Sequence, residues 1–261
     1  MVGAPDGWER NRMDITTTAG GIAQMMRGVW SADIPVPGLA WSVGQVGAHL
    51  VTLPRRYRRV MRDPEPFPSD LSALNTTELA TVGQHDPEDL ADLLEAEVDE
   101  LLADLGDDGA RTVPFFSMEH SVAGVGGVLL SELLVHGWDL ARVERIPWPI
   151  TADQARSGLR GLLPTVPHQI GPATAAGTRG TLHLRLRPDE DWTIEMGDGS
   201  VSVESGRPGQ ADVHVSTDPA TFLLVAYGRV SRRRARFRAG LVGYGRKPWL
   251  SGPLTNLLTA A

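Results

Sequence analysis

The sequence predicts an α-helical bundle followed by a smaller α+β domain. Its length of 261 residues is about twice that of a common single domain, so we expect two domains. Apolar residues recur at helical spacing in the first half, whereas they alternate with polar residues after residue 180. A segment with two prolines, residues 145–150, separates these patterns. We therefore predict a four-helix bundle over residues 14–145 and an α+β domain with an antiparallel sheet over residues 150–261.

Two helices are expected before residue 60. Apolar residues at helical spacing predict the first over residues 16–31, and a segment rich in proline and glycine follows it. Ser42 and Gln45 have the spacing of a capping box, which predicts the start of the second helix. This helix is expected to run toward Arg59, and Pro54 can bend it.

The next two helices have clearer limits. Asp86 can cap a helix over residues 86–105, Pro87 fits its first turn, and Gly106 ends it. One face of this helix is apolar, and the acidic opposite face is expected to be a solvated surface. The fourth helix, residues 122–142, is apolar nearly all round and is therefore expected to be buried.

The second domain is expected to combine a sheet with short helices. Alternation of apolar and polar residues predicts strands at residues 182–186, 192–196, 201–203 and 213–215. Helices are expected over residues 152–163, 218–227 and 254–258.

The composition excludes several kinds of function. The net charge of −7 disfavours a nucleic-acid partner, and no apolar run approaches the roughly 18 residues of a membrane helix. The polar N-terminus lacks the apolar stretch of a secretory signal, so we expect a cytoplasmic protein. Because the chain has no cysteine, any thiol chemistry needs an external thiol. Lys247 is the only lysine, which nearly excludes a lysine Schiff base.

Two ionisable residues in the apolar fourth helix are the strongest candidates for chemistry. Glu132 and His136 lie four residues apart, on one face of that helix. A buried carboxylate and imidazole need partners, so they either pair with each other or bind a metal. His49, on the expected inward face of the second helix, can supply a third ligand. Two histidines and one glutamate with an open position form a ligand set of catalytic zinc, whereas the alternative is a satisfied core histidine beside a Glu–His pair.

Two segments resemble motifs of the mycothiol-dependent maleylpyruvate isomerase family. The sequence PVPGLAW at residues 35–41, followed by SVGQVGAH ending at His49, is similar to the proline-glycine-tryptophan entry and histidine helix of that family. The sequence ELLVHGWDLA at residues 132–141 resembles its second metal motif. The resemblance implies a DinB-like four-helix metal domain followed by a domain similar to sterol-carrier proteins, with metal bound by His49, Glu132 and His136.

The resemblance also implies cofactors and partners. Family members bind a divalent metal, usually zinc, and use the low-mass thiol mycothiol. An open metal position can hold this thiol as a nucleophilic thiolate, which attacks a small electrophilic substrate and leads to cis–trans isomerisation or to S-transfer. We expect no nucleic-acid partner and no membrane insertion, and we expect a monomer or homodimer.

Other residues near the motifs have secondary interpretations. Asp139 lies one turn after His136 and either orients its ring or is a surface residue of the helix. Trp41 and Trp138 are expected to be packing residues, and the alternative is that they stack on the substrate. His120, just before the fourth helix, is a weak candidate for the substrate site.

Arginines form two groups that suit carboxylates. One of them can hold an acidic substrate or the carboxylate of the thiol, although most are expected to be solvated surface charge. In the family an arginine of the second domain contributes to the catalytic site, and Arg229 is the matching residue here. The groups are Arg55, Arg56, Arg58 and Arg59, and then Arg229, Arg232, Arg233, Arg234, Arg236 and Arg238.

Two other functions use the same features. A non-catalytic protein can bind a small molecule or lipid in the second domain and keep the metal site as a structural one. A metal-dependent hydrolase can activate water with the same three ligands, but the sequence offers no evident second carboxylate to act as the base.

Overall fold

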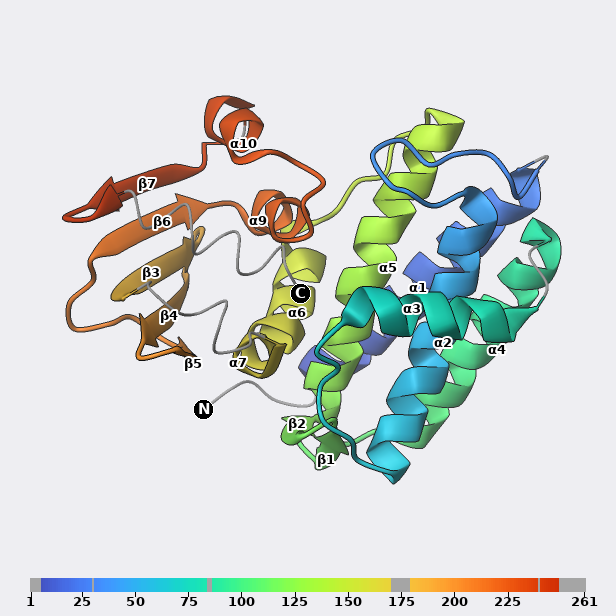
Figure 1. Cartoon of the computed structure of the whole chain (residues 1–261), viewed down its shortest axis with the longest axis horizontal. Coiled ribbons are helices and arrows are strands. Elements are labelled where there is room, and N and C mark those ends of the chain that lie inside the picture. The colour runs from blue at the N-terminus through green and yellow to red at the C-terminus, as the bar shows by residue number, and fades with distance from the viewer. Residues whose placement is uncertain (1–5, 30, 84–85, 170–178, 239, 249–261) are drawn as a thin grey trace. The chain divides into compact units, whose positions relative to one another are not determined.

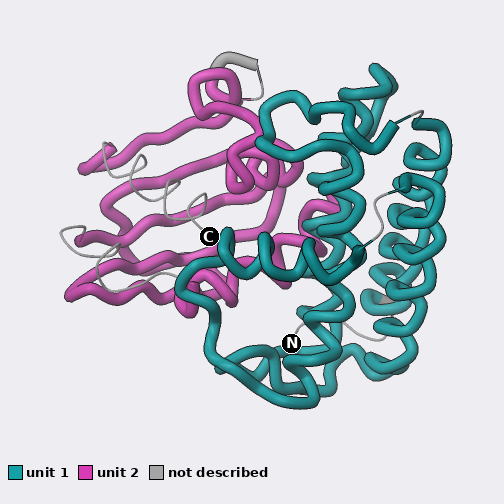
Figure 2. Tube along the Cα trace, turned by 45° about the vertical axis from the view of Figure 1, so that its right-hand side comes forward, with its two compact units in different colours: residues 1–150 teal, residues 151–261 magenta. Residues whose placement is uncertain are grey.

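The chain folds into two compact units, residues 1–150 and 151–261 (Figure 2). The structure is a computed structural model, and it describes residues 6–29, 31–83, 86–169, 179–238 and 240–248. The described part of the first unit is helical with one short hairpin, whereas the second unit combines a sheet with short helices (Figure 1).

Four long helices among the described residues of the first unit form a bundle. α1 packs against α4 and α5, and α2 packs against the same two helices, so α1 and α2 occupy opposite corners. A shorter helix, α3, contacts α2, and the hairpin of β1 and β2 packs against α2 and α5 (Figure 1). The elements are α1 (Asp6–Gly28), α2 (Val43–Arg62), α3 (Leu71–Val82), α4 (Pro87–Leu105), β1 (Thr112–Phe115), β2 (Met118–Ser121) and α5 (Val122–Glu144).

The helix limits of α2 and α4 follow the signals in the sequence. The capping box of α2 is present, because Ser42 Oγ accepts from the Gln45 amide and the Gln45 side chain accepts from the Ser42 amide. The Asp86 side chain caps α4, and Gly106 ends it with a φ of 70°. Pro54 lies inside α2 and does not end it.

Helix α1 begins earlier than predicted and ends earlier too. It spans Asp6–Gly28, whereas the apolar stripe predicts residues 16–31. The added first turns are anchored by Trp8, which is 3% exposed and whose indole N–H donates to the Gly106 carbonyl at 2.9 Å. A Cβ at Gly126 would collide with the Trp8 ring, so this glycine of α5 allows the two helices to pack closely.

Helix α3 is not predicted by the sequence pattern because it has almost no apolar face. Leu79 is its one buried residue among those described. Polar contacts hold it instead: the guanidinium of Arg56 donates twice to Glu78, at 2.9 and 2.6 Å, and once to Asn75 at 2.6 Å. Arg56 itself is 5% exposed, so this is a buried pair that ties α3 to α2.

The acidic face of α4 is not simply a solvated surface, as the sequence suggests. Arg55 donates to Glu97 at 2.6 Å, and Arg58 and Arg62 donate to Asp104 at 2.9 and 2.7 Å. Exposed ion pairs of this kind contribute about 0–1 kcal/mol each to the free energy of unfolding. The row of pairs thus orients α2 along α4 more than it stabilises the bundle.

The second unit is a sheet with helices on one side (Figure 1). The strand order is β5-β4-β3-β6-β7. Leu182, Leu184 and Leu186 are buried on one face of β3, as the alternation in the sequence predicts. The elements are α6 (Ala152–Leu162), η1 (Leu163–Thr165), α7 (Val166–Gln169), β3 (Gly180–Leu186), β4 (Glu190–Gly197), β5 (Ser200–Ser205), β6 (Val213–Thr217), α9 (Pro219–Ala226), α10 (Arg232–Arg238) and β7 (Val242–Gly245).

The sheet differs from the prediction in two details. It is antiparallel except for β3 and β6, which run parallel with Leu182 opposite Val213. Period-two alternation identifies strands but carries no information on their direction, and residues 206–212 return the chain past β4 to the free edge of β3. The glycine-rich strand β7 is also missing from the prediction. The helix predicted at residues 254–258 lies outside the described residues.

Candidate metal centre

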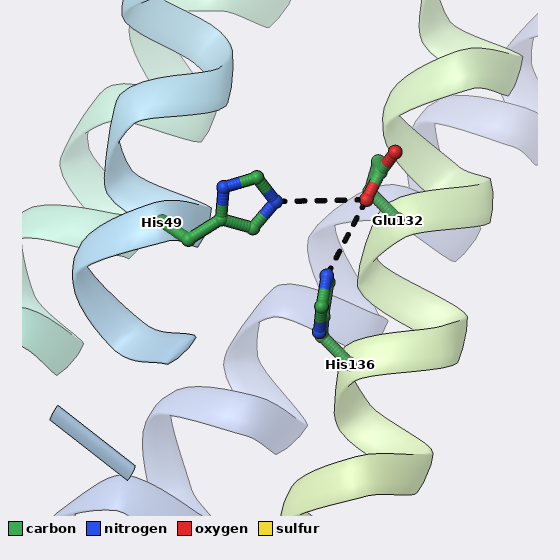
Figure 3. A group of neighbouring side chains, drawn as sticks. All are labelled: His49, Glu132 and His136. Atoms are coloured by element: carbon green, nitrogen blue, oxygen red, sulfur yellow. Dashed lines mark ion pairs between the residues drawn. The ribbon is translucent and has the colours of Figure 1, made fainter. Parts of the chain in front are cut away.

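Three side chains from two neighbouring helices of the bundle converge on one point (Figure 3). His49 lies on α2, and Glu132 and His136 lie one turn apart on α5. The capping box fixes where α2 begins, and the packing of α2 on α5 turns His49 toward the two residues of α5. The three residues singled out in the sequence are therefore neighbours in space, although 83 residues separate His49 from Glu132 in the chain.

The distances in this cluster are those of ligands around an ion. Glu132 Oε2 lies 3.7 Å from His49 Nε2 and 3.5 Å from His136 Nε2. Both separations exceed the roughly 2.7–3.2 Å of an N–H···O hydrogen bond. They are close to the roughly 3.3 Å between two ligand atoms that each bind tetrahedral zinc at about 2.0–2.1 Å. One ligand atom from each residue lies within 4.8 Å of the others.

The protonation states suit a cation as well. Burial lowers the pKa of His49 to about 4 against the opposing attraction of Glu132, so its imidazole is neutral near pH 7 and keeps a lone pair. Burial alone would raise the pKa of Glu132, but the neighbouring imidazoles of His136 and His49 outweigh it and the pKa is lowered. The cluster is therefore a buried carboxylate beside a neutral imidazole, which is a donor set that fits a divalent cation.

The outer nitrogens of the two imidazoles have different surroundings. His136 Nδ1 lies 3.2 Å from Asp139 Oδ2, and Asp139 is 1% exposed. Asp139 thus faces the imidazole and is not a surface residue, which was the alternative interpretation of the sequence. His49 Nδ1 is buried and makes no hydrogen bond with any described group.

Trp41 borders both imidazoles, which the sequence pattern does not reveal. Its ring centroid lies 4.9 Å from that of His49 and 6.2 Å from that of His136, nearly parallel to the latter. Trp138 has a different role, since the guanidinium of Arg142 lies 4.7 Å from its ring centroid. Both tryptophans are half-buried.

The arginines predicted as carboxylate binders on α2 are already engaged. Arg55 and Arg56 pair with Glu97 and Glu78, as described above. Arg58 pairs with acidic residues of α4, and Arg59 pairs with Glu65 at 2.8 Å and with Glu78 at 3.4 Å. In the second unit, Arg229 Nη1 donates to the Tyr227 carbonyl at 2.7 Å.

His120 does not join the cluster of three. It is 7% exposed and its ring lies 6.0 Å from the ring of Phe115. A Cβ at Gly124 would collide with the His120 imidazole, so the glycine at the start of α5 makes room for it. This contact accounts for the histidine by packing.

A second group of ionisable residues lies on the sheet of the second unit. His183 Nε2 is 2.6 Å from Asp191 Oδ1, His183 Nδ1 is 2.9 Å from His214 Nδ1, and the His214 ring stacks on Tyr244. In the sequence the two histidines merely fall on the polar side of separate strands. The signal that joins them is the register of the parallel pair, which places His183 opposite His214.

Comparison with known proteins assigns each unit to a family model. Residues 16–141 match the mycothiol maleylpyruvate isomerase N-terminal domain, and residues 162–242 match the SCP-2 sterol transfer family. Comparison with the curated proteins gives no sequence match. None of the described helices is long and apolar enough to cross a membrane.

Solved structures of a mycothiol-dependent maleylpyruvate isomerase have a similar fold over most of the chain. The crystal structure of the mycothiol-dependent maleylpyruvate isomerase aligns with a TM-score of 0.52 and 20% identity, over 86% of this chain and 90% of that one. A histidine-to-alanine variant of that isomerase aligns with a TM-score of 0.52 and 18% identity, again over 86% and 90%. The chain therefore carries the N-terminal domain of the mycothiol maleylpyruvate isomerase family, followed by a domain of the SCP-2 sterol transfer family.

Proposed function

We propose that this chain is a metal-dependent enzyme that uses mycothiol to isomerise a small electrophilic substrate, with His49, Glu132 and His136 as the metal ligands. The observation that carries the proposal is the spacing of the three ligand atoms. Their separations of 3.5 and 3.7 Å are too long for good hydrogen bonds and fit a cation between them.

The protonation states in the cluster favour a cation. The His49 imidazole is neutral near pH 7 because burial lowers its pKa, and the Glu132 carboxylate supplies the negative charge. Asp139 Oδ2 lies 3.2 Å from His136 Nδ1, and this carboxylate favours a proton on Nδ1, which leaves the lone pair of Nε2 for the ion. When bound with an open position, a divalent cation lowers the pKa of a thiol and so makes a thiolate available near neutral pH.

The isomerisation then needs no redox partner. When bound, mycothiol would supply a thiolate for reversible addition to one carbon of the cis double bond, with the π electrons moving to the conjugated carbonyl oxygen. Rotation about the resulting single bond and loss of the thiolate would give the trans form, so atoms and electrons would balance. S-transfer shares the first step and differs only in that the C–S bond is retained.

Arg229 is the residue proposed to hold a substrate carboxylate, because it matches the arginine that the family contributes from its second domain. Arg229→Ala is expected to raise the KM for a carboxylate substrate more than it lowers kcat. Arg236→Ala is the matched control, since it removes an exposed arginine of α10. An unchanged KM in Arg229→Ala would remove this residue from the proposal.

The direct test is a product assay with maleylpyruvate on the zinc-loaded protein, with and without mycothiol. The proposal expects trans product only when both zinc and mycothiol are present, and none from His136→Ala. A stable thioether product would indicate S-transfer. Turnover without thiol would indicate hydrolysis. No turnover together with displacement of a fluorescent fatty acid would favour the lipid-binding alternative.

A further inference from the structure

One loop of the first unit places an indole ring against the candidate metal ligands. This segment, residues 35–42, is called the proline loop below. Pro35 forms an isolated β-bridge with Ser42, and the Val36 amide donates to the Trp41 carbonyl at 3.0 Å. These bonds fix the backbone of Trp41 directly before the capping box of α2. The indole of Trp41 is thereby held against the rings of both histidines.

Arg142 holds the tip of this loop from α5. Its Nη1 donates to the Pro37 carbonyl at 2.8 Å, and its guanidinium lies over the ring of Trp138, one turn earlier on the same helix. The loop lies beside the last turns of α5 (Figure 1). Stacking on Trp138 fixes the plane of the guanidinium, so its N–H groups point toward the Pro37 carbonyl.

Arg142 differs from the arginines of α2 in what it contacts. Those residues pair with carboxylates of α3, of α4 and of the segment between α2 and α3, as Arg56 does with Glu78 and Arg59 with Glu65. Within the described part of the chain no acidic side chain forms an ion pair with Arg142. Its contacts are directed to the proline loop and to Trp138.

The two imidazoles depend on the loop to different degrees. His136 has Asp139 beside its outer nitrogen, which fixes the plane of the ring. His49 Nδ1 has no hydrogen-bond partner among the described groups, so packing contributes to the orientation of the ring beside the contact of its Nε2 with Glu132. Two rings pack against the His49 imidazole, with centroid separations of 4.9 Å for Trp41 and 5.0 Å for His136.

We propose that Arg142 is a positioning residue of the candidate metal centre, which acts through the proline loop and Trp41 on the orientation of the His49 ring. Its consequence for metal binding rests on the proposed function. The positioning itself is a property of the metal-free chain and is testable without any metal. Trp41 serves His49 by packing, whereas His136 has the charged carboxylate of Asp139 beside its outer nitrogen at 3.2 Å.

The test is a histidine-selective NMR spectrum of the metal-free, full-length protein, in which the imidazole resonances are assigned with His49→Gln and His136→Gln. Trp41→Phe defines how far the His49 shifts move when the indole ring current is lost. Arg142→Ala is expected to move the His49 resonances most of the way in that direction and those of His136 less. Arg142→Lys keeps a donor but not the planar stack, so it should restore the shifts in part.

Arg111→Ala is the matched control, because Arg111 also donates to a backbone carbonyl, that of Leu105 at 2.7 Å. It should leave both imidazoles unchanged. Unchanged His49 resonances in Arg142→Ala, where Trp41→Phe moves them, would overturn the proposal. If Arg142→Ala does not fold, Arg142→Lys and Trp138→Leu decide in the same way, since unmoved resonances in both would also overturn it.

A zinc titration separates this proposal from the proposed function. In Arg142→Ala the affinity for zinc is expected to fall about tenfold or less, as for loss of an outer contact. If the wild-type chain binds no zinc, the proposed function fails, and the metal-free spectra still decide whether Arg142 positions His49.

Discussion

The bundle and the sheet each contain a cluster of carboxylate and imidazole groups, and the two clusters are arranged differently. In the bundle, Nε2 atoms of His49 and His136 both face one oxygen of Glu132, at 3.7 and 3.5 Å. In the sheet, the groups form a row in which Asp191 meets His183 at 2.6 Å and His183 meets His214 at 2.9 Å.

The difference lies in where the lone pairs point. In the row, each facing pair of atoms lies at hydrogen-bonding distance, so a shared proton occupies the lone pair that a metal ion would need. In the bundle the atoms converge at distances too long for hydrogen bonds, which leaves room for an ion. Neighbouring strands present side chains in rows, whereas a helix turn and a facing helix can converge on a point. Both clusters contain histidine and carboxylate side chains, but only in the bundle cluster do the ligand atoms converge on one point, and this distinguishes the candidate metal centre from the row in the sheet.

The strongest test of this comparison removes one imidazole from each cluster. His49→Ala and His136→Ala should each lower zinc affinity by more than the about 10–100-fold that loss of an outer partner costs, with helical circular dichroism retained. His183→Ala, the matched control in the sheet, should leave zinc affinity unchanged. Isothermal titration or a chelator competition measures all three. Full zinc occupancy in both bundle variants would show that the ligand assignment is wrong.

Acid should destabilise the metal-free bundle through His49. The pKa of His49 is about 4 in the folded chain, whereas the ordinary value of 6.5 applies once the chain unfolds, so the unfolded chain binds more protons between these values. The contribution is complete above pH 6.5 and is lost as the pH falls toward 4, by roughly 3 kcal/mol. Urea unfolding followed by tryptophan fluorescence at several pH values measures it.

The matched variants for this pH effect are His49→Gln and His214→Gln. His49→Gln should flatten the loss of bundle stability on acidification. His214→Gln should not, although burial also lowers the pKa of His214, because that residue belongs to the second unit. An identical acid response in His49→Gln and the wild type would contradict the assignment of this titration to His49.

A smaller effect is expected from the carboxylates that orient the histidines. Asp139→Asn should weaken zinc binding by about 10–100-fold, because the carboxylate 3.2 Å from His136 Nδ1 loses its charge while the side-chain volume stays the same. Asp191→Asn makes the same change beside His183 and should not affect zinc. Equal zinc affinities for Asp139→Asn and the wild type would mean that packing alone holds the His136 ring.

The smallest expected effect is on the local stability of the sheet. His183 is 2% exposed and hydrogen-bonds on both sides, so His183→Ala should cost about 1–2 kcal/mol. Amide hydrogen exchange in β3 and β6 should accelerate about 5–30-fold, and exchange in α2 and α5 should not change. Unaltered exchange in the sheet would show that the row contributes little to folding.

The sequence predicts the elements with strong local signals. The capping box at Ser42, the cap at Asp86 and the stop at Gly106 define α2 and α4 because capping is a local interaction. The sequence pattern does not predict helix α3, because α3 has almost no apolar face and is held by hydrogen bonds from the buried Arg56. The sequence pattern also does not predict the parallel pairing of β3 with β6, because strand pairing depends on residues far apart in the chain.

The candidate site shows the same division. The spacing of Glu132 and His136 places both on one face of α5, and the expected inward face of the second helix adds His49 as a third candidate. The contact of Trp41 with both imidazoles and the bond from Arg142 to Pro37 depend on how a loop folds back on the bundle, which no local pattern encodes. The pairing of the α2 arginines with acidic side chains is likewise a tertiary property.

The most direct test of the central claim is a mycothiol titration of the cobalt-substituted protein, followed by visible and near-ultraviolet absorption. We predict that cobalt binds and that mycothiol adds a sulfur-to-cobalt charge-transfer band, which is absent in His136→Ala. Bound cobalt without such a band would mean that the thiol is not held at the metal, and hydrolysis would become the better proposal. Failure of the wild-type chain to bind cobalt would contradict the claim that His49, Glu132 and His136 form a metal centre.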